Sequence, residues 1–196
     1  MIIDNKTYWE CKKCFVKFLD KKHYLDRHSE KNHYLKHENN IKDKRYQNFL
    51  SKLYIPLKKK LSINDKGLDF GCGHGPALAY MFKMDGFNVD IYDPFFYSRN
   101  EIFLKKYDFI SCTEVVEHFW NPLKEFDILN NLLKKSGWLG IMTCFYEKNI
   151  VFKNWHYRRD PTHVTFYSAK TFEYIADKQN WMCEIKTKDV VLFKKK

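Results

Sequence analysis

Three glycines at alternate positions, Gly71, Gly73 and Gly75, follow a short apolar run that carries Asp69. Glycines at this spacing let the backbone take unusual dihedral angles or let a ligand approach it closely. In an open α/β sheet, a loop after the first strand lies at the edge where ligands bind. The dinucleotide fingerprint G-x-G-x-x-G does not fit, because the third glycine comes one residue early. A second acid, Asp93, stands 18 residues after Gly75, where the next strand should end.

The apolar pattern around this loop predicts strands that alternate with helices. This order indicates a mostly parallel sheet with right-handed crossovers, and the last two β-like runs suggest a hairpin added to its edge. Pro56 should bend the first helix or divide it in two. The strands are expected at 66–70, 87–93, 107–113, 138–145, 182–188 and 189–195, and the helices at 44–61, 76–86, 121–137 and 168–180.

The helix before the fourth strand has the most complete set of terminal signals. Asn121 is placed as its N-cap, and Pro122 stands at its first position, where a missing N–H does no harm. Lys134 and Lys135 fall in the last turn, near the negative end of the helix dipole, and Gly137 comes just past the end. We therefore expect the helix to fill the positions between Asn121 and Gly137.

The pattern D-x-G-x-G-x-G from Asp69 to Gly75, with Asp93 ending the next strand, resembles motif I of class I S-adenosylmethionine (SAM)-dependent methyltransferases. In that family the glycine loop lets the backbone approach the methionine and ribose part of the cofactor, and the acid binds both ribose hydroxyls. The resemblance therefore implies that Asp93 is the ribose ligand, with Asp90 as a rival that lies too early in the strand. The cofactor-binding residues that it implies are Asp69, Gly71, Cys72, Gly73, Gly75, Asp93, Pro94, Thr113 and Glu114.

The segment YDFISCTEVVEHFWNP at 107–122 resembles the fourth-strand motif of the same family. By this likeness Thr113 and Glu114, with Ser111 and Cys112 before them, lie beside the adenine and the sulfonium, and Glu117 and His118 lie near the mouth of the site. Only 13 residues separate Asp93 from Tyr107, too few for the usual third strand and its helix. The implied fold is an α/β three-layer α-β-α sandwich of Rossmann-like type. Its sheet is mostly parallel, with an antiparallel C-terminal hairpin strand, and is shortened around the third strand.

The segment WHYRRDPTHVTFYSAKTF at 155–172 resembles the acceptor side of a largely uncharacterised bacterial subgroup of these enzymes. Trp155, Tyr157 and Tyr167 are expected to wall the acceptor pocket, and Arg158 either binds an anionic acceptor group or faces solvent. A hydroxyl or protonated amine acceptor needs a general base, for which His163 is the first candidate and His118 the second. A hydrogen-bonded structural histidine explains either residue equally well.

A second set of residues suits a metal. Cys11-x2-Cys14 and His28-x4-His33 lie one residue from the spacing of a C2H2 zinc finger. Members of the subgroup carry an N-terminal zinc ribbon of two Cys-x2-Cys knuckles, of which this chain has one. Either the histidines complete a zinc site, or the knuckle is a remnant without metal. Residues 1–40 are accordingly expected to form a Cys- and His-containing extension, and residues 41–196 the methyltransferase domain.

The composition is that of a globular protein, with 44% hydrophobic and 18% aromatic residues among 196. No stretch approaches the roughly 18 uninterrupted apolar residues of a membrane span, and the N-terminus lacks the pattern of a signal peptide. Apart from Cys11 and Cys14, the cysteines stand singly, which suits free thiols in a reducing compartment. These features predict a cytoplasmic protein with no membrane partner.

The positive charge is uneven along the chain. Residues 1–66 hold 17 Lys and Arg against 8 Asp and Glu, a net charge of +9, whereas the other 130 residues hold 18 against 16, a net charge of +2. A basic N-terminal third suits nucleic acid, although a solvated lysine surface explains it as well. The resemblance favours methyl transfer from SAM to a small molecule. The alternatives are a nucleic-acid-binding module and an RNA methyltransferase.

Overall fold

A six-stranded sheet forms the centre of the computed structural model, which describes residues 1–36, 39–147 and 150–196. Its strand order is β5-β4-β6-β7-β10-β9; the first four strands are parallel, and β10 runs antiparallel to both β7 and β9. This is the mostly parallel sheet with a C-terminal hairpin that the sequence predicted. The strands are β4 (Lys66–Phe70), β5 (Asn88–Tyr92), β6 (Tyr107–Thr113), β7 (Leu133–Met142), β9 (Trp181–Ile185) and β10 (Val190–Lys195).

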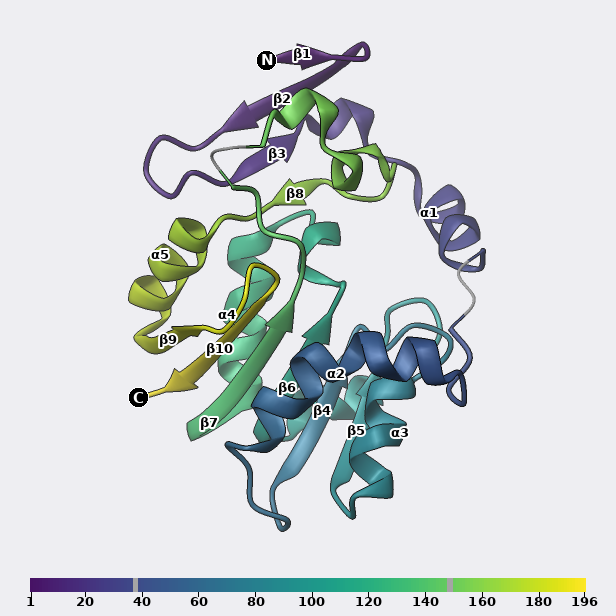
Figure 1. The fold of residues 1–196 in the computed structure, drawn as a ribbon, viewed down its shortest axis with the longest axis vertical. Helices are drawn as coiled ribbons and strands as arrows, with labels where there is room; N and C mark the ends of the chain where they lie inside the picture. Colours follow the sequence, from purple (N-terminus) through teal and green to yellow (C-terminus); the bar gives the residue numbers. More distant parts are fainter. Residues whose placement is uncertain (37–38, 148–149) are drawn as a thin grey trace.

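Helices cover both faces of this sheet, which gives the expected three layers (Figure 1). α2 (Lys44–Lys58) and α3 (Ala77–Met84) pack on one face, and α4 (Pro122–Leu132) and α5 (Ala169–Gln179) on the other. Strand β10 shows why, because its side chains alternate between two separate cores. Val190 and Leu192 join the core under α2 and α3, whereas Val191 and Phe193 join the core under α4 and α5.

Two helix ends differ from the expectation. α4 begins at Pro122 under the Asn121 cap, as predicted, but it ends at Leu132, so Lys134 and Lys135 lie in β7. Strand pairing overrides the helical signal here, because Leu133 pairs with Tyr107 and the Lys134 ammonium donates to both carboxylate oxygens of Asp108 at 2.9 Å.

The first long helix, α2, continues past Pro56 to Lys58, so the proline does not divide it. Pro56 lies two positions before the last residue of the helix, so the hydrogen bond that its missing N–H removes falls in the last turn.

The shortened side of the sheet is confirmed. Strand β5 lies at its edge, and the chain between β5 and β6 holds only an isolated bridge between Asp93 and Tyr97 and a short 3-10 helix at Asn100–Leu104. No third parallel strand occurs in this described stretch. One residue of the 3-10 helix, Ile102, is buried in the core, so the helix closes the side where the usual strand is missing.

A second, antiparallel sheet lies above the first and was not predicted (Figure 1). Its order is β1-β2-β3-β8, and the pairing of β3 with β8 joins the N-terminus to the segment after β7. A separate core of side chains from residues 3–19 and 152–166 lies beneath it. The strands are β1 (Ile2–Ile3), β2 (Lys6–Glu10), β3 (Lys17–Leu19) and β8 (Thr165–Phe166).

Helix α1 (Arg27–Tyr34) connects this small sheet to the rest of the chain, and Asp26 caps it by accepting from the backbone N–H groups of His28 and Ser29. The other short 3-10 helices lie at Lys21–His23, Val116–His118, Phe152–Asn154 and His156–Arg159. None of the described helices has both the length and the apolar character that crossing a bilayer requires.

Candidate active site

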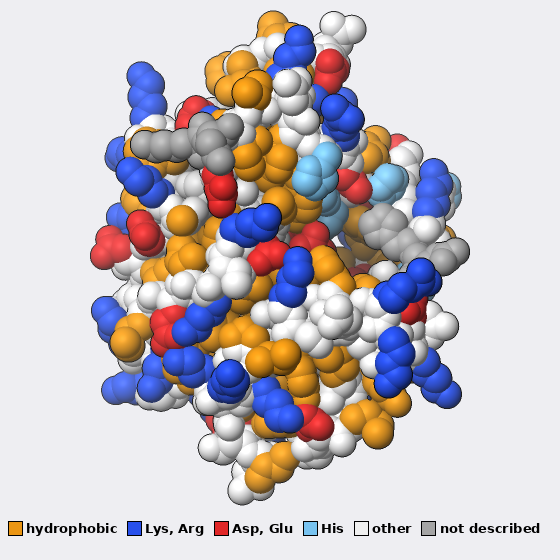
Figure 2. Space-filling model, viewed as in Figure 1, with side chains coloured by type: hydrophobic (Ala, Val, Ile, Leu, Met, Phe, Trp, Pro, Cys, Tyr) orange, Lys and Arg blue, Asp and Glu red, His pale blue; other side chains and the backbone are white. Residues whose placement is uncertain are grey.

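A cavity of about 700 Å³ opens at the carboxyl ends of β4, β5 and β6. Figure 2 shows the surface hollowed on this face, with histidine and acidic side chains at the rim. Eight of the nine residues predicted to bind a cofactor line this one cavity: Asp69, Gly71, Cys72, Gly73, Asp93, Pro94, Thr113 and Glu114. The structure therefore brings together the glycine loop and the ends of the next two strands, as an open α/β sheet requires.

The glycines of the loop serve different purposes. Gly71 and Gly73 have positive φ angles of 77° and 64°, which only glycine adopts easily, and a Cβ at Gly71 would lie 2.5 Å from the Val115 side chain. Gly75, the ninth predicted residue, is not among the lining residues. A Cβ there would lie 1.8 Å from the Asn39 carbonyl oxygen. Gly75 thus allows two backbone segments to pack closely rather than exposing backbone to a ligand.

Asp93 is anchored by three backbone groups. Its Oδ2 accepts from the Gly73 N–H at 3.0 Å, and its Oδ1 accepts from the N–H groups of Phe95 and Phe96 at 2.8 and 3.2 Å. Burial raises the pKa of this carboxyl. A carboxylate has about four acceptor positions, so one on Oδ2 is left beside these three bonds. The rival Asp90 lies outside the cavity lining and instead accepts from Lys105.

Asp69 lies deeper, at the junction of three elements. Its carboxylate accepts from the Ser111 hydroxyl of β6 at 2.8 Å and from the Ala79 N–H of α3 at 3.3 Å. Burial raises the pKa of Asp69 to about 6. Ser111 and Cys112 were expected beside a cofactor, but both are fully buried and neither lines the cavity. By contrast, the Thr113 Oγ1 is buried at the cavity wall and has no hydrogen-bond partner within the described residues.

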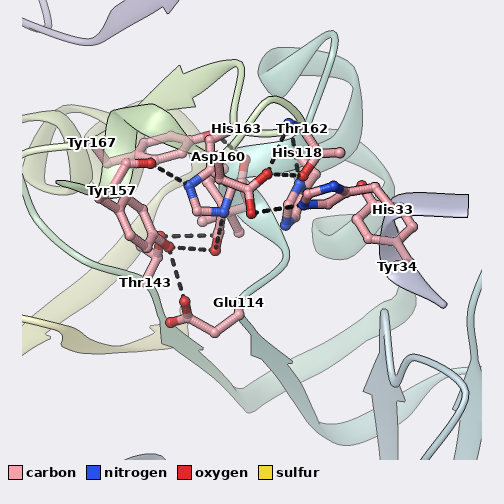
Figure 3. Close-up of polar contacts among 12 residues, drawn as sticks. His33, Tyr34, Glu114, His118, Thr143, Tyr157, Asp160, Thr162, His163 and Tyr167 are labelled. Atoms are coloured by element: carbon pink, nitrogen blue, oxygen red, sulfur yellow. Dashed lines mark hydrogen bonds and ion pairs between the residues drawn. The ribbon is translucent and has the colours of Figure 1, made fainter. Parts of the chain in front are cut away.

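Two glutamates, the half-buried Glu114 and the buried Glu117, share one phenol. Glu114, which has a positive φ of 53°, places Oε2 at 3.1 Å from the Tyr157 hydroxyl, and the same hydroxyl contacts Oε1 of Glu117 (Figure 3). Oε2 of Glu117 accepts from the Thr143 hydroxyl at 2.9 Å. One phenol proton cannot serve two charged carboxylates. Burial, with the charge of Glu117 nearby, raises the pKa of Glu114 to about 9, so Glu114 is the partner that holds a proton.

The two histidines proposed as bases lie side by side at the cavity wall, with ring centroids 4.8 Å apart. Nδ1 of His163 lies 2.7 Å from the Tyr157 carbonyl oxygen, and Nδ1 of His118 lies 3.0 Å from the Thr162 carbonyl oxygen. Burial lowers the pKa of His163 to about 3, which makes it a weak base. The structure thus places His163 and His118 at the site but gives His163 poor properties for abstracting a proton.

The expected acceptor wall needs correction, because none of its four residues lines the cavity. Trp155 and Tyr157 are buried in the core under the small sheet, and the Tyr157 hydroxyl reaches the site only through Glu114 and Glu117. Tyr167 is buried in the core under α4 and α5 and donates to the Val116 carbonyl oxygen at 3.0 Å.

Arg158 is buried rather than facing a substrate. It donates to Asp4 Oδ2 at 2.8 Å, to the Tyr8 hydroxyl at 3.2 Å and to the Lys153 carbonyl oxygen at 2.9 Å, so it ties the small sheet to the segment after β7. Its neighbour Arg159 is exposed.

The opposite wall of the cavity was missed. α1 contributes Arg27, Glu30 and Tyr34, where the Tyr34 hydroxyl donates to Glu30 at 2.7 Å and burial raises the pKa of Glu30. Phe95 and Phe96 follow Asp93 directly and also line the cavity. This aromatic pair next to the predicted ribose ligand was the only signal in the sequence that pointed to this wall.

The predicted zinc ligands do not meet. Among the described residues, no three of Cys11, Cys14, His28 and His33 come close enough to share an ion. The two cysteines lie in the turn between β2 and β3, whereas His33 of α1 lies 3.1 Å from the Asp160 carboxylate. The C2H2-like spacing does not produce a site, because α1 places His33 against Asp160 while His28 is exposed.

The sheet order and the cavity at the carboxyl ends of its strands define a ligand-binding α/β protein of Rossmann-like type. The chain belongs to the methyltransferase domain family, whose model matches residues 34–184. No curated protein sequence matches it significantly.

Similar folds occur among solved structures. A SAM-dependent methyltransferase from Archaeoglobus fulgidus superimposes with a TM-score of 0.58 at 17% identity, over 78% of this chain and 95% of that one. A putative sarcosine dimethylglycine methyltransferase from Galdieria sulphuraria gives 0.55 at 22%, over 69% and 60%. The YcgJ protein from Bacillus subtilis gives 0.52 at 18%, over 69% and 70%. At these identities the likeness shows the fold alone.

Proposed function

We propose that this protein transfers a methyl group from S-adenosylmethionine to a small-molecule acceptor. The observation that carries the proposal is the single cavity that joins the Gly71–Gly73 loop, Asp93 and the end of β6. Its volume of about 700 Å³ falls within the usual range for small-molecule and cofactor sites. The family match supports methyl transfer as the reaction class.

The residues present fit the cofactor. Asp93 has an acceptor position left for a ribose hydroxyl, and Gly71 and Gly73 line the same cavity. The Thr113 hydroxyl, buried without a described partner, is the kind of polar group that a bound molecule satisfies. When bound, SAM supplies an electrophilic methyl group on its sulfonium. The work of this chain is then to bind and orient the two reactants in a site that excludes water.

The charge of the cavity favours a small acceptor that is neutral or cationic. Besides the protonated Glu114, acidic side chains at Glu30, Asp69, Asp93, Glu125 and Asp160 line it, against one arginine, Arg27. Lysines and arginines are scattered over the face in Figure 2 and do not form a continuous stripe leading to the hollow. A phosphate backbone would meet mostly negative charge at the site, so we place an RNA acceptor and a nucleic-acid-binding module below a small molecule.

Isothermal calorimetry with SAM tests the cofactor assignment. Asp93→Ala should weaken SAM binding about 10-fold or more, because a hydrogen bond to a charged group contributes about 1.5–3 kcal/mol. Asp90→Ala is the matched control, since Asp90 lies in β5 three residues before Asp93 but outside the cavity, and this variant should bind SAM as the wild type does. Equal binding by both variants would contradict the assignment of Asp93.

Methyl transfer from labelled SAM tests the acceptor. The label should appear in a metabolite fraction of the source cell and not in its RNA. Label in RNA would replace the small-molecule acceptor by an RNA acceptor. Salt-dependent binding of RNA or DNA by a protein that binds no SAM would instead support the nucleic-acid-binding module.

A further inference from the structure

Three side chains beside the cavity have the donor set of a cation site. Glu117, His118 and His163 each offer one ligand atom, and these atoms lie within 4.8 Å of one another. Within residues 1–36, 39–147 and 150–196, no other group of three His, Cys, Asp or Glu residues meets this condition. Glu117 is fully buried, the His163 side chain is 10% exposed, and both histidines line the cavity.

Backbone carbonyls orient both rings. A carbonyl oxygen can only accept, so Nδ1 of His163 donates to Tyr157 and Nδ1 of His118 donates to Thr162. In the neutral rings the lone pair is therefore on Nε2. Metal-binding histidines use this arrangement, in which one nitrogen donates to a carbonyl and the other binds the metal. Nε2 of His163 lies 4.0 Å from Oε1 of Glu117.

The carboxylate is fixed in the same way. The Thr143 hydroxyl donates to one oxygen of Glu117, and the Tyr157 hydroxyl contacts the other. Figure 3 shows Tyr157 and Thr143 on one side of the His163 ring and Asp160 and His118 on the other. In metal sites of proteins, each ligand is usually held in place by such an outer hydrogen-bond partner.

We propose that Glu117, His118 and His163 bind a divalent first-row transition-metal cation at the wall of the cavity. Two imidazoles and one carboxylate suit manganese, iron, cobalt or zinc, whereas magnesium and calcium take oxygen ligands. Bonds of about 2.0–2.2 Å hold neighbouring donors roughly 3–3.5 Å apart, so the side chains draw together by about 1 Å on binding. Three protein ligands leave some coordination positions of the cation open. Because His118 and His163 line the cavity, we expect these open positions to face it.

The role of the cation rests on the proposed function. It would offset the negative charge of Glu117 and Asp160, and an open position would bind an oxygen of the acceptor. A hydroxyl bound to the cation would give up its proton to solvent far more readily than a free one, and its oxygen would bond to the methyl carbon as the S–CH3 bond of SAM breaks. The site therefore makes a hydroxyl oxygen the expected acceptor atom and removes the need for His163 to act as a base.

Titration of the metal-stripped, full-length protein with Co²⁺ tests the site by visible absorption and by melting temperature. The wild type should bind one equivalent, with ligand-field bands and no thiolate charge-transfer band. A hundredfold excess over the dissociation constant should raise the melting temperature by about 5–10 °C. His118→Ala and Glu117→Gln should each weaken binding more than about 100-fold, since loss of even an outer partner costs 10–100-fold.

Two controls separate this site from other cobalt ligands. His156→Ala removes an exposed histidine outside the cluster, and the double variant Cys11→Ser, Cys14→Ser removes the cysteine pair; both should bind Co²⁺ as the wild type does. His118 is partly exposed, so its variant should fold even if that of buried Glu117 does not. No cobalt bands in the wild type, or unchanged affinity in folded His118→Ala, would overturn the metal site.

Calorimetry with SAM on the same samples keeps the two proposals apart. Co²⁺ binding without SAM binding would retain the metal site and overturn the methyl-transfer proposal. SAM binding without Co²⁺ binding would do the reverse and return the two histidines to a purely hydrogen-bonded role.

Discussion

The substitution Asp69→Asn should change how the stability of the protein depends on pH. Asp69 is 3% exposed, and burial raises its pKa from 3.8 to about 6. Asparagine has nearly the same shape and no charge. Its oxygen can accept from the Ala79 N–H, and its amide can donate to the Ser111 hydroxyl, which rotates to accept. The variant therefore keeps both contacts and loses only the ionisation.

The direction in which the free energy of unfolding changes with pH follows from the number of protons that each state binds. Well below pH 4, Asp69 is protonated in both the folded and the unfolded state. Between about pH 4 and 6 the folded state keeps a proton that the unfolded state has lost, so the free energy of unfolding falls as the pH rises. Each tenfold difference in proton affinity is worth about 1.4 kcal/mol. A pKa raised from 3.8 to about 6 thus corresponds to a loss of about 3 kcal/mol by pH 7.

Urea unfolding at pH 4, 5, 6 and 7, followed by circular dichroism, measures this loss. The wild type should lose about 2.5 kcal/mol more than Asp69→Asn between pH 4 and 7, because a small part of the change already lies below pH 4. Asp93 and Lys83 face Asp69, but they are present in both proteins and largely cancel in the difference. Asp90→Asn is a control in which the effect on the pH dependence of stability has the opposite sign, because hydrogen bonds from Lys105 and Tyr107 lower the pKa of Asp90. If the free energies of unfolding of wild type and Asp69→Asn changed with pH in parallel, the assignment of this loss to Asp69 would be refuted.

Two further substitutions test the packing around the site. Gly75→Ala would place a Cβ 1.8 Å from the Asn39 carbonyl oxygen. This clash should lower the free energy of unfolding, measured in urea, by about 3 kcal/mol. A loss below about 1 kcal/mol would show that the two segments are not in contact. Arg158→Met should lower the free energy of unfolding by about 2 kcal/mol, because the hydrogen bonds to Asp4, Tyr8 and Lys153 are lost. The SAM affinity measured by calorimetry should stay unchanged. Weaker SAM binding by a folded variant would show that Arg158 belongs to the site.

The features that the sequence predicted well depend on neighbouring residues. The glycine loop and Asp93 belong to one strand-loop-helix-strand unit, so their spacing in the chain sets their spacing in the cavity. The start of α4 was found for the same reason, because the Asn121 side chain accepts from the N–H three residues later. The end of α4 was misplaced because Leu133 pairs with Tyr107, a contact between distant strands that a capping pattern does not contain.

The features that were missed depend on contacts between distant parts of the chain. The strands of the small sheet have only two to five residues, too few for a periodic signal, and β3 pairs with β8 near the other end of the chain. Arg158 was expected at a substrate because its partner Tyr8 lies 150 positions away. From the sequence alone, a charged residue in an aromatic segment suggests a binding role, because a hydrogen-bond partner elsewhere in the chain cannot be recognised.

These distant contacts also explain how the acceptor end of the cavity is built. The segment after β7 is held against the N-terminal sheet by Arg158 and by the β3–β8 pairing, and His163 lies between these two anchors. On the other side, α1 brings His33 to the Asp160 carboxylate and Glu30 into the cavity wall. Residues 1–34 therefore do more than extend the chain, because the position of His163, and with it the proposed metal site, depends on the sheet and helix that they form.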